Sequence, residues 1–128
     1  MSYYFNKMLA VSFDEAVTKV TEELKKVGFG ILTEIDVKDT LKKKIDVDFR
    51  KYKILGACNP PFAHKALQVE DKIGLMLPCN VIVQEFSEKE VEVAAVDPAA
   101  AMVGIDNINL KEVATEVRTK LQKAIHNL

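Results

Sequence analysis

The stretch SFDEAVTKVTEELKKVG at residues 12–28 carries the clearest structural signal in the chain. Ser12 and Glu15 form the S-x-x-E capping pattern, in which each side chain accepts a hydrogen bond from a backbone N–H of the first turn. Apolar residues follow at alternating steps of four and three, which places them in one stripe: Phe13, Val17, Val20, Leu24 and Val27. Gly28 then ends the pattern, because glycine enters the left-handed region without a Cβ clash. The stretch predicts an amphipathic helix that packs on a sheet.

Strand-like segments precede and follow this helix in the sequence. They are rich in β-branched and aromatic residues and cover 3–11, 30–35, 51–58, 80–86 and 91–96. Further helices are predicted after Asn59, where Pro60 suits the first turn, and after Asn109 as its N-cap. This order predicts an α+β two-layer sandwich with a curved sheet of about five strands, mixed or mainly antiparallel, and helices packed on one face.

Residues 36–50 fit two structures. Asp36 is a suitable N-cap for a short helix that runs to about Lys44. The alternation of Ile45, Val47 and Phe49 equally suits a strand. The sequence leaves both alternatives open.

The sheet face away from the helices is predicted to be apolar. Its expected residues are Tyr4, Met8, Leu32, Leu55, Ile82 and Phe86. An open face of this kind usually packs against another protein surface, most often a second copy of the chain. We therefore expect a homodimer.

Composition and charge narrow the class of protein. A chain of 128 residues with 48% hydrophobic residues has the size and composition of a single globular domain, which we expect to span residues 1–128. The 18 basic and 19 acidic residues nearly balance, so the chain has no net positive potential that would attract nucleic acid. A local basic excess at 38–53 contains interrupting Asp residues, and we interpret it as a solvated face.

The sequence also predicts a cytoplasmic location without membrane attachment. The N-terminal stretch lacks the long apolar region of a secretory signal. The longest segment without charge, Ile73–Gln84, is too short to span a bilayer and contains Pro78. Two cysteines in a chain of this length are no disulfide framework and suit a reducing compartment.

Two Cys-Asn dipeptides mark the candidate site. Cys58-Asn59 precedes Pro60 at a predicted strand-to-helix junction, where the helix N-terminus stabilises a thiolate. Cys79-Asn80 follows Pro78 at the start of a later strand. His64 falls in the second turn of the predicted helix, so Cys58, Cys79 and His64 are expected to approach one end of the sheet.

Three interpretations of these residues remain open. In the first, a thiolate beside the imidazole acts as a nucleophile, with Cys58, Cys79 and His64 as catalytic candidates. In the second, the same three side chains bind a soft metal, although their spacing departs from standard zinc sites. In the third, both cysteines are small buried residues without chemistry. The residues proposed to contact a ligand are Asn59, Pro60, Pro78, Asn80 and Asp97.

Three segments resemble domain-of-unknown-function family 302: ILGACNP at 54–60, Ala63–Leu67, and GLMLPCNVIV at 74–83. The resemblance covers nearly the whole chain and implies a two-layer α/β fold with helices on a curved sheet, and homodimers. It implies no activity or cofactor. It draws attention to the matched positions, which are Asn59, Pro60, Pro78, Cys79 and Asp97.

Together these observations predict a homodimeric cytoplasmic protein with a shallow ligand pocket between the Cys58–His64 junction and the Pro78–Cys79 turn. The alternative is a non-enzymatic interaction or assembly module with structural cysteines. Whether the protein is an enzyme, and whether it binds a cofactor, are left open by the sequence.

Overall fold

The computed structural model describes residues 2–128 and contains a five-stranded antiparallel sheet. The strands are β1 (Tyr4–Leu9), β2 (Gly30–Asp36), β3 (Tyr52–Cys58), β4 (Cys79–Ser87) and β5 (Glu90–Val96). Their order across the sheet is β1-β5-β4-β3-β2, and every neighbouring pair is antiparallel. The predicted α+β class and strand number are confirmed, and the sheet is antiparallel rather than mixed.

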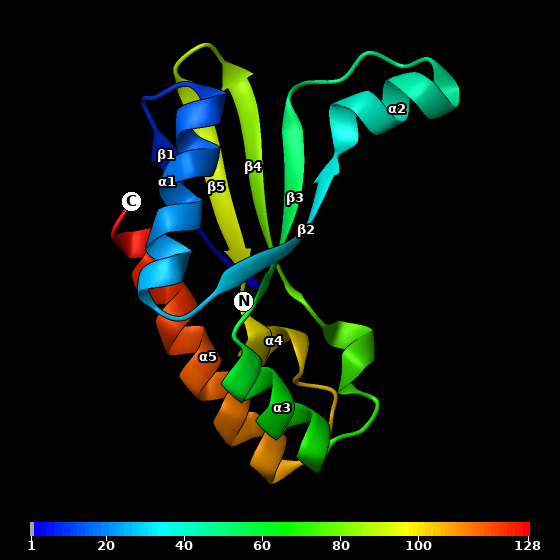
Figure 1. Cartoon of the computed structure of the whole chain (residues 1–128), viewed down its shortest axis with the longest axis vertical. Helices are drawn as coiled ribbons and strands as arrows, with labels where there is room; N and C mark the ends of the chain where they lie inside the picture. Colours follow the sequence, from blue (N-terminus) through cyan, green and yellow to red (C-terminus); the bar gives the residue numbers. More distant parts are fainter. Residues whose placement is uncertain (1) are drawn as a thin grey trace.

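The two long helices cover one face of this sheet (Figure 1). They are α1 (Phe13–Lys26) and α5 (Ile108–His126), and they contact each other as well as the strands. The core between the layers is apolar, with Val81, Val83, Val91 and Val93 fully buried. None of the helices in residues 2–128 combines the length and the apolar character needed to cross a membrane.

Helix α1 forms as its sequence predicts. The Ser12 hydroxyl accepts from the Glu15 N–H at 3.2 Å, and the buried stripe contains Phe13, Val20 and Leu24. Gly28 follows the helix with a φ of 92°. The N-cap of α5 differs from the prediction: Asn107, not Asn109, accepts from the first-turn N–H groups.

Residues 37–51 form a helix and an extended loop that project from the sheet (Figure 1). Helix α2 (Val37–Ile45) begins with Asp36, which accepts from the Asp39 N–H, and it buries no residue. Val47 and Phe49 lie in the loop and join no strand. The helical alternative is correct because the capping interaction and the left-handed Asp46 define a short helix with both ends satisfied.

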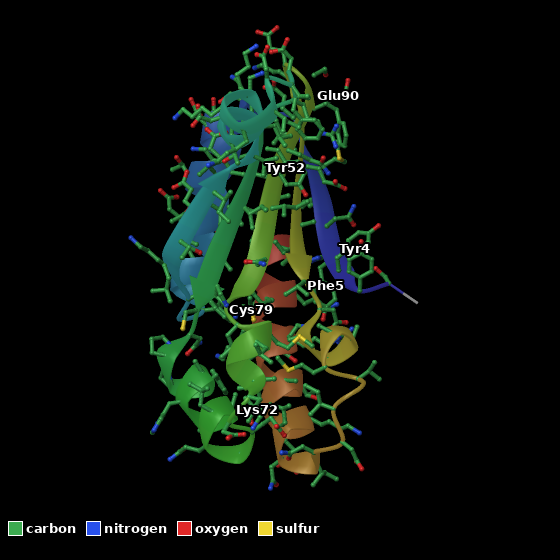
Figure 2. The ribbon with its side chains drawn as sticks, turned by 90° about the vertical axis from the view of Figure 1, so that its right-hand side faces the viewer. Tyr4, Phe5, Tyr52, Lys72, Cys79 and Glu90 are labelled. Carbon is green, nitrogen blue, oxygen red and sulfur yellow. The ribbon has the colours of Figure 1, made fainter. Side chains whose placement is uncertain are left out.

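The second sheet face is open, and its composition differs from the prediction at two residues. Tyr4, Met8 and Phe86 are exposed on it, and Figure 2 looks onto this face with α5 behind the strands. Leu55 instead pairs with Val81 on the helix-covered face and is only 1% exposed. Leu32 lies at an irregularity in the β2–β3 register, which turns it away from the regular alternation.

Three other short helices form a separate end of the molecule beyond the strands (Figure 1). They are α3 (Pro60–Val69), the 3₁₀ helix η1 (Ile73–Met76) and α4 (Pro98–Ala101). A second apolar cluster joins them to the first turns of α5; its members are Ala66, Ile73, Met102, Leu110 and Ala114. The region between this cluster and the end of the sheet contains the candidate site.

Candidate functional site

The two cysteines lie on neighbouring strands at the same end of the sheet. Cys58 is the last residue of β3, Cys79 is the first of β4, and Ala57 pairs directly with Cys79. Both cysteines are free; Cys58 is half-buried and Cys79 is buried. The tertiary structure therefore brings together two thiols that are 21 positions apart in the sequence.

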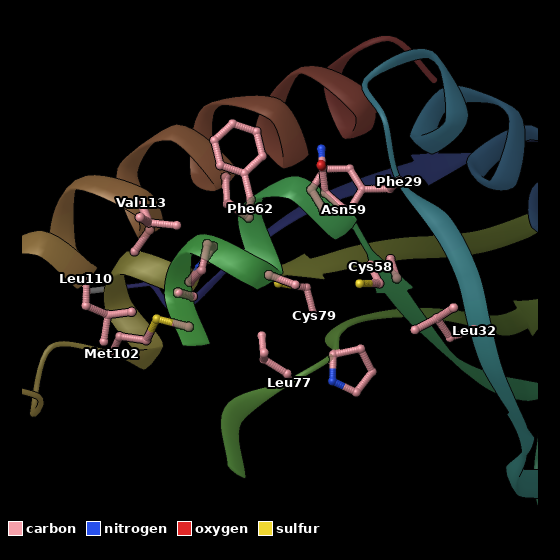
Figure 3. A pocket seen from close by; sticks show the side chains of 17 residues that line it. Phe29, Leu32, Cys58, Asn59, Phe62, Leu77, Cys79, Met102, Leu110 and Val113 are labelled. Carbon is pink, nitrogen blue, oxygen red and sulfur yellow. The ribbon is translucent and has the colours of Figure 1, made fainter. Parts of the chain in front are cut away.

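An apolar cavity of about 250 Å³ lies at this end of the sheet (Figure 3). Its walls come from β3, α3, the Leu77–Cys79 turn, α4 and α5. Four of the predicted site residues line it: Cys58, Asn59, Pro78 and Cys79. The remaining lining residues are mostly aromatic or aliphatic, so the site favours apolar ligand groups.

The close approach of β2, β3 and the Pro78 turn shapes one wall of the cavity. A Cβ at Gly56 would overlap the Thr33 side chain and would lie 2.7 Å from Pro78 Cγ. Glycine at this position therefore lets the turn pack directly on β3. The irregular residue Leu32 adds its side chain to the same wall.

Asn59 occupies the predicted N-cap position of α3, but its side chain does not cap the helix. Its Nδ2 instead donates to the carbonyl of Val27 at 3.3 Å, which ties the start of α3 to the end of α1. A Cβ at Gly28 would lie 2.8 Å from this Nδ2. The side chain is buried in the cavity wall beside Phe29 and Phe62 (Figure 3).

The other predicted contact residues lie outside this cavity. Pro60 is exposed at the first turn of α3, and Asn80 is exposed on the first residues of β4. Asp97 caps α4 by accepting from the N–H groups of Ala99 and Ala100, and it pairs with Arg118 at 3.0 Å. The geometry gives Asp97 a structural contact at the end of β5 rather than a place in the cavity wall.

His64 is not brought to the cysteines. It is exposed on α3 and does not line the cavity, because the inward side of that helix carries Phe62, Ala63 and Ala66. Among residues 2–128, no three His, Cys, Asp or Glu side chains are grouped as a metal site. The predicted grouping of Cys58, His64 and Cys79 is therefore absent from the described part of the chain.

Burial determines the protonation of Cys79. Removal from water, and to a smaller extent the nearby Cys58, raises the pKa of the Cys79 thiol from 9.0 to about 11. The thiol is therefore neutral at physiological pH. This favours an apolar contact role for Cys79 over the thiolate nucleophile that the sequence left open.

Sequence reasoning missed the wall that α5 contributes. Leu110, Val113, Ala114 and Val117 all line the cavity, yet in the sequence they read as an ordinary apolar helix stripe. Met102, which precedes α5, also lines it. The helical spacing indicated that this face would be buried, but the sequence contained no signal that it would border a cavity.

A row of polar side chains crosses the open sheet face and was also missed. Asn6 and Gln84 each donate to the Glu92 carboxylate, at 2.8 and 2.7 Å, and Arg50 Nε donates to Gln84 Oε1 at 3.0 Å. The Arg50 guanidinium also lies 4.4 Å from the Phe49 ring centroid. Period-two alternation places Asn6, Gln84 and Glu92 on one face, but their pairing depends on strand order, and Arg50 reaches Gln84 from the loop before β3.

Comparison with known proteins gives a family and a fold. A crystal structure of the uncharacterized conserved protein DUF302 from Bacillus stearothermophilus superimposes with a TM-score of 0.90 at 24% sequence identity, and the match covers 98% of each chain. No functionally curated protein matches this chain. The family model described as "Domain of unknown function DUF302" matches residues 5–128. The chain therefore belongs to the DUF302 family.

Proposed function

We propose that this protein binds a small, mainly apolar ligand in the cavity between α3, α5 and the Leu77–Cys79 turn. The single observation that supports this function is the apolar lining of a space of about 250 Å³, to which β2, β3, α3, the Leu77–Cys79 turn, α4 and α5 all contribute. An engineered apolar cavity of about 150 Å³ is large enough to bind benzene. A cavity of this size therefore suits a ligand somewhat larger than one aromatic ring.

The proposed binding is noncovalent. Cys79 is protonated at physiological pH because burial raises its pKa to about 11, and His64 is too exposed and too far around α3 to border the cavity. Thioether and thiol sulfur atoms are soft and polarisable, and they pack well against aromatic groups. Cys58 and Cys79 then serve as apolar contacts.

Nuclear magnetic resonance titration with two neutral probes, toluene and 1-octanol, tests this proposal. The expected result is a saturable shift of the methyl signals of Leu77, Met102 and Val113, which line the cavity from three different segments. Signals from Val47, in the projecting loop, report nonspecific binding. Shifts that are equal at both places, or absent, would contradict a ligand cavity.

A matched pair of substitutions on α3 assigns the binding to the cavity. Ala63→Leu adds bulk to a lining position, whereas Gln68→Leu adds the same side chain to an exposed position outside it. We expect Ala63→Leu to weaken probe binding at least tenfold and Gln68→Leu to leave it unchanged. Equal affinities in the two variants would place the binding elsewhere.

A second candidate function, assembly with another copy of the chain, is favoured by the open sheet face. Tyr4 and Met8 on β1 and Phe86 on β4 are 42%, 50% and 54% exposed there. Large exposed apolar side chains on one face are typical of an interface. We propose a homodimer through this face, and a reducing cytoplasmic location in keeping with two free cysteines.

A further inference from the structure

Two lysines stand beside one aromatic wall of the ligand cavity. Phe62 lines the cavity and is only half-buried, so its ring lies where the cavity wall meets solvent. Lys65 Nζ is 5.2 Å from the centroid of this ring, and Lys120 Nζ is 5.7 Å from it. One lysine comes from α3 and the other from α5, the two helices that enclose this side of the cavity.

Neither ammonium group is neutralised by an ion pair. In residues 2–128, no carboxylate oxygen lies within 4.0 Å of Lys65 or Lys120, although seven other ion pairs are formed. The ring provides a weak cation–π contact in place of an anion. Two positive charges without an ion-pair partner therefore lie beside Phe62, which lines the cavity, although neither lysine is itself a lining residue.

We propose that the ligand is a small amphipathic carboxylate, whose apolar part fills the cavity and whose carboxylate binds Lys65 and Lys120 at the Phe62 edge. This inference rests on the proposed function and specifies the ligand class. Lysine has a flexible stem and three donors, so each ammonium group can turn from the ring toward a carboxylate. No bond forms or breaks, and no proton is transferred in the binding step.

The shape of the cavity agrees with such a ligand. Figure 3 shows the lining side chains arranged between two ends, with Phe29 and Asn59 at one end and Leu110 and Met102 at the other, and with Phe62 between them beside α5. The end formed by Met102 and Leu110 belongs to the second apolar cluster, which has no charged group among its members. A charged head group at that end would lose its hydration without a partner, which favours the Phe62 edge.

The test uses octanoate and 1-octanol, which share an eight-carbon chain and differ in charge. Isothermal titration calorimetry is performed on the full chain at low and at moderate salt. We expect octanoate to bind about three- to tenfold more tightly than 1-octanol, which represents the eight-carbon chain without the charge. The expected gain is modest because each exposed ion pair contributes little. Added salt should weaken octanoate binding and leave 1-octanol binding unchanged.

The double substitution Lys65→Gln and Lys120→Gln removes the two charges from partly or fully exposed positions. We expect it to weaken octanoate binding about three- to tenfold and to leave 1-octanol binding unchanged. Lys19→Gln, on α1, is the control for the loss of a lysine elsewhere and should change neither affinity.

The outcomes separate this inference from the proposed function. If 1-octanol binds but octanoate binding is insensitive both to salt and to the double substitution, the carboxylate inference is overturned and the apolar cavity stands. If neither probe binds the unmodified protein, both proposals fail.

Discussion

The two faces of the sheet are built from the same strands but differ in how their side chains are stabilised: by burial on one face and by hydrogen bonds on the other. On the helix-covered face, Val81, Val83, Val91 and Val93 are fully buried under α1 and α5. On the open face, the polar row from Asn6 to Arg50 is hydrogen-bonded within the chain, while the apolar side chains around it stay in contact with solvent.

The chain therefore completes its own fold on one face of the sheet only. The covered face stabilises the fold through the burial of apolar side chains, and the free energy gained scales with the apolar surface removed from water. The open face contributes specific hydrogen bonds and leaves apolar area available for another surface. Substitutions on the first face should therefore affect folding, and substitutions on the second should affect assembly.

Leu55→Ala should produce the largest loss of stability. The Leu55 side chain is 1% exposed on the covered face, and truncation of a buried leucine costs about 2–5 kcal/mol. Urea denaturation measures the free energy of unfolding. Met8→Ala, at a half-exposed position on the open face, is the control and should cost less than about 1 kcal/mol. Equal losses in the two variants would remove the distinction between the faces.

Glu92→Ala should produce an intermediate loss. It removes the acceptor of Gln84, whose side chain is 9% exposed and would keep a donor without a partner. A buried donor left unpaired costs about 1–3 kcal/mol. Glu90→Ala, an exposed position on the same strand, is the control in the same urea experiment. A loss no greater than that of the control would show that the polar row contributes nothing to folding.

Alkaline pH should weaken the fold through Cys79. Its folded pKa is raised from 9.0 to about 11, so the neutral thiol stabilises the fold below pH 9 and this contribution is lost as pH rises toward 11. The unfolding free energy of the Cys79→Ala variant should fall less over this interval than that of the unmodified chain. The pKa of Lys53 is also raised, by Glu34, but Lys53 is present in both proteins. Its contribution therefore cancels when their unfolding free energies are subtracted. Parallel pH profiles would contradict a buried thiol.

Met8→Lys should have the smallest effect on the folding of one chain and a clear effect on assembly. The new ammonium group would lie opposite Glu92 in the β1–β5 register, so we expect the stability of one chain to change by less than about 0.5 kcal/mol. Sedimentation equilibrium should show the proposed dimer for the unmodified chain and a monomer for this variant. Leu75→Lys, at an exposed apolar residue outside the sheet, should remain dimeric. A dimer that survives Met8→Lys would exclude the open face as its interface.

Elements with strong local signals are predictable from the amino-acid sequence alone. The capping box and apolar stripe of residues 12–28 specify α1 because helix capping and amphipathicity depend on neighbours three and four residues apart. The five strands and the start of α3 after Asn59 follow from equally local patterns. The two Cys-Asn dipeptides indicated the sheet end at which the cavity lies, since both occur at strand termini.

Other features depend on how the whole chain packs, and local sequence patterns do not predict them. The run Ile54–Ala57 has no polar side chain, so alternation alone did not reveal that Leu55 faces the helices. Residues 36–50 satisfied both a helical and a strand pattern. The cavity, its α5 wall and the meeting of Lys65 with Lys120 require segments more than 50 positions apart to pack together. Such contacts depend on strand order and helix packing, which no short stretch of sequence encodes.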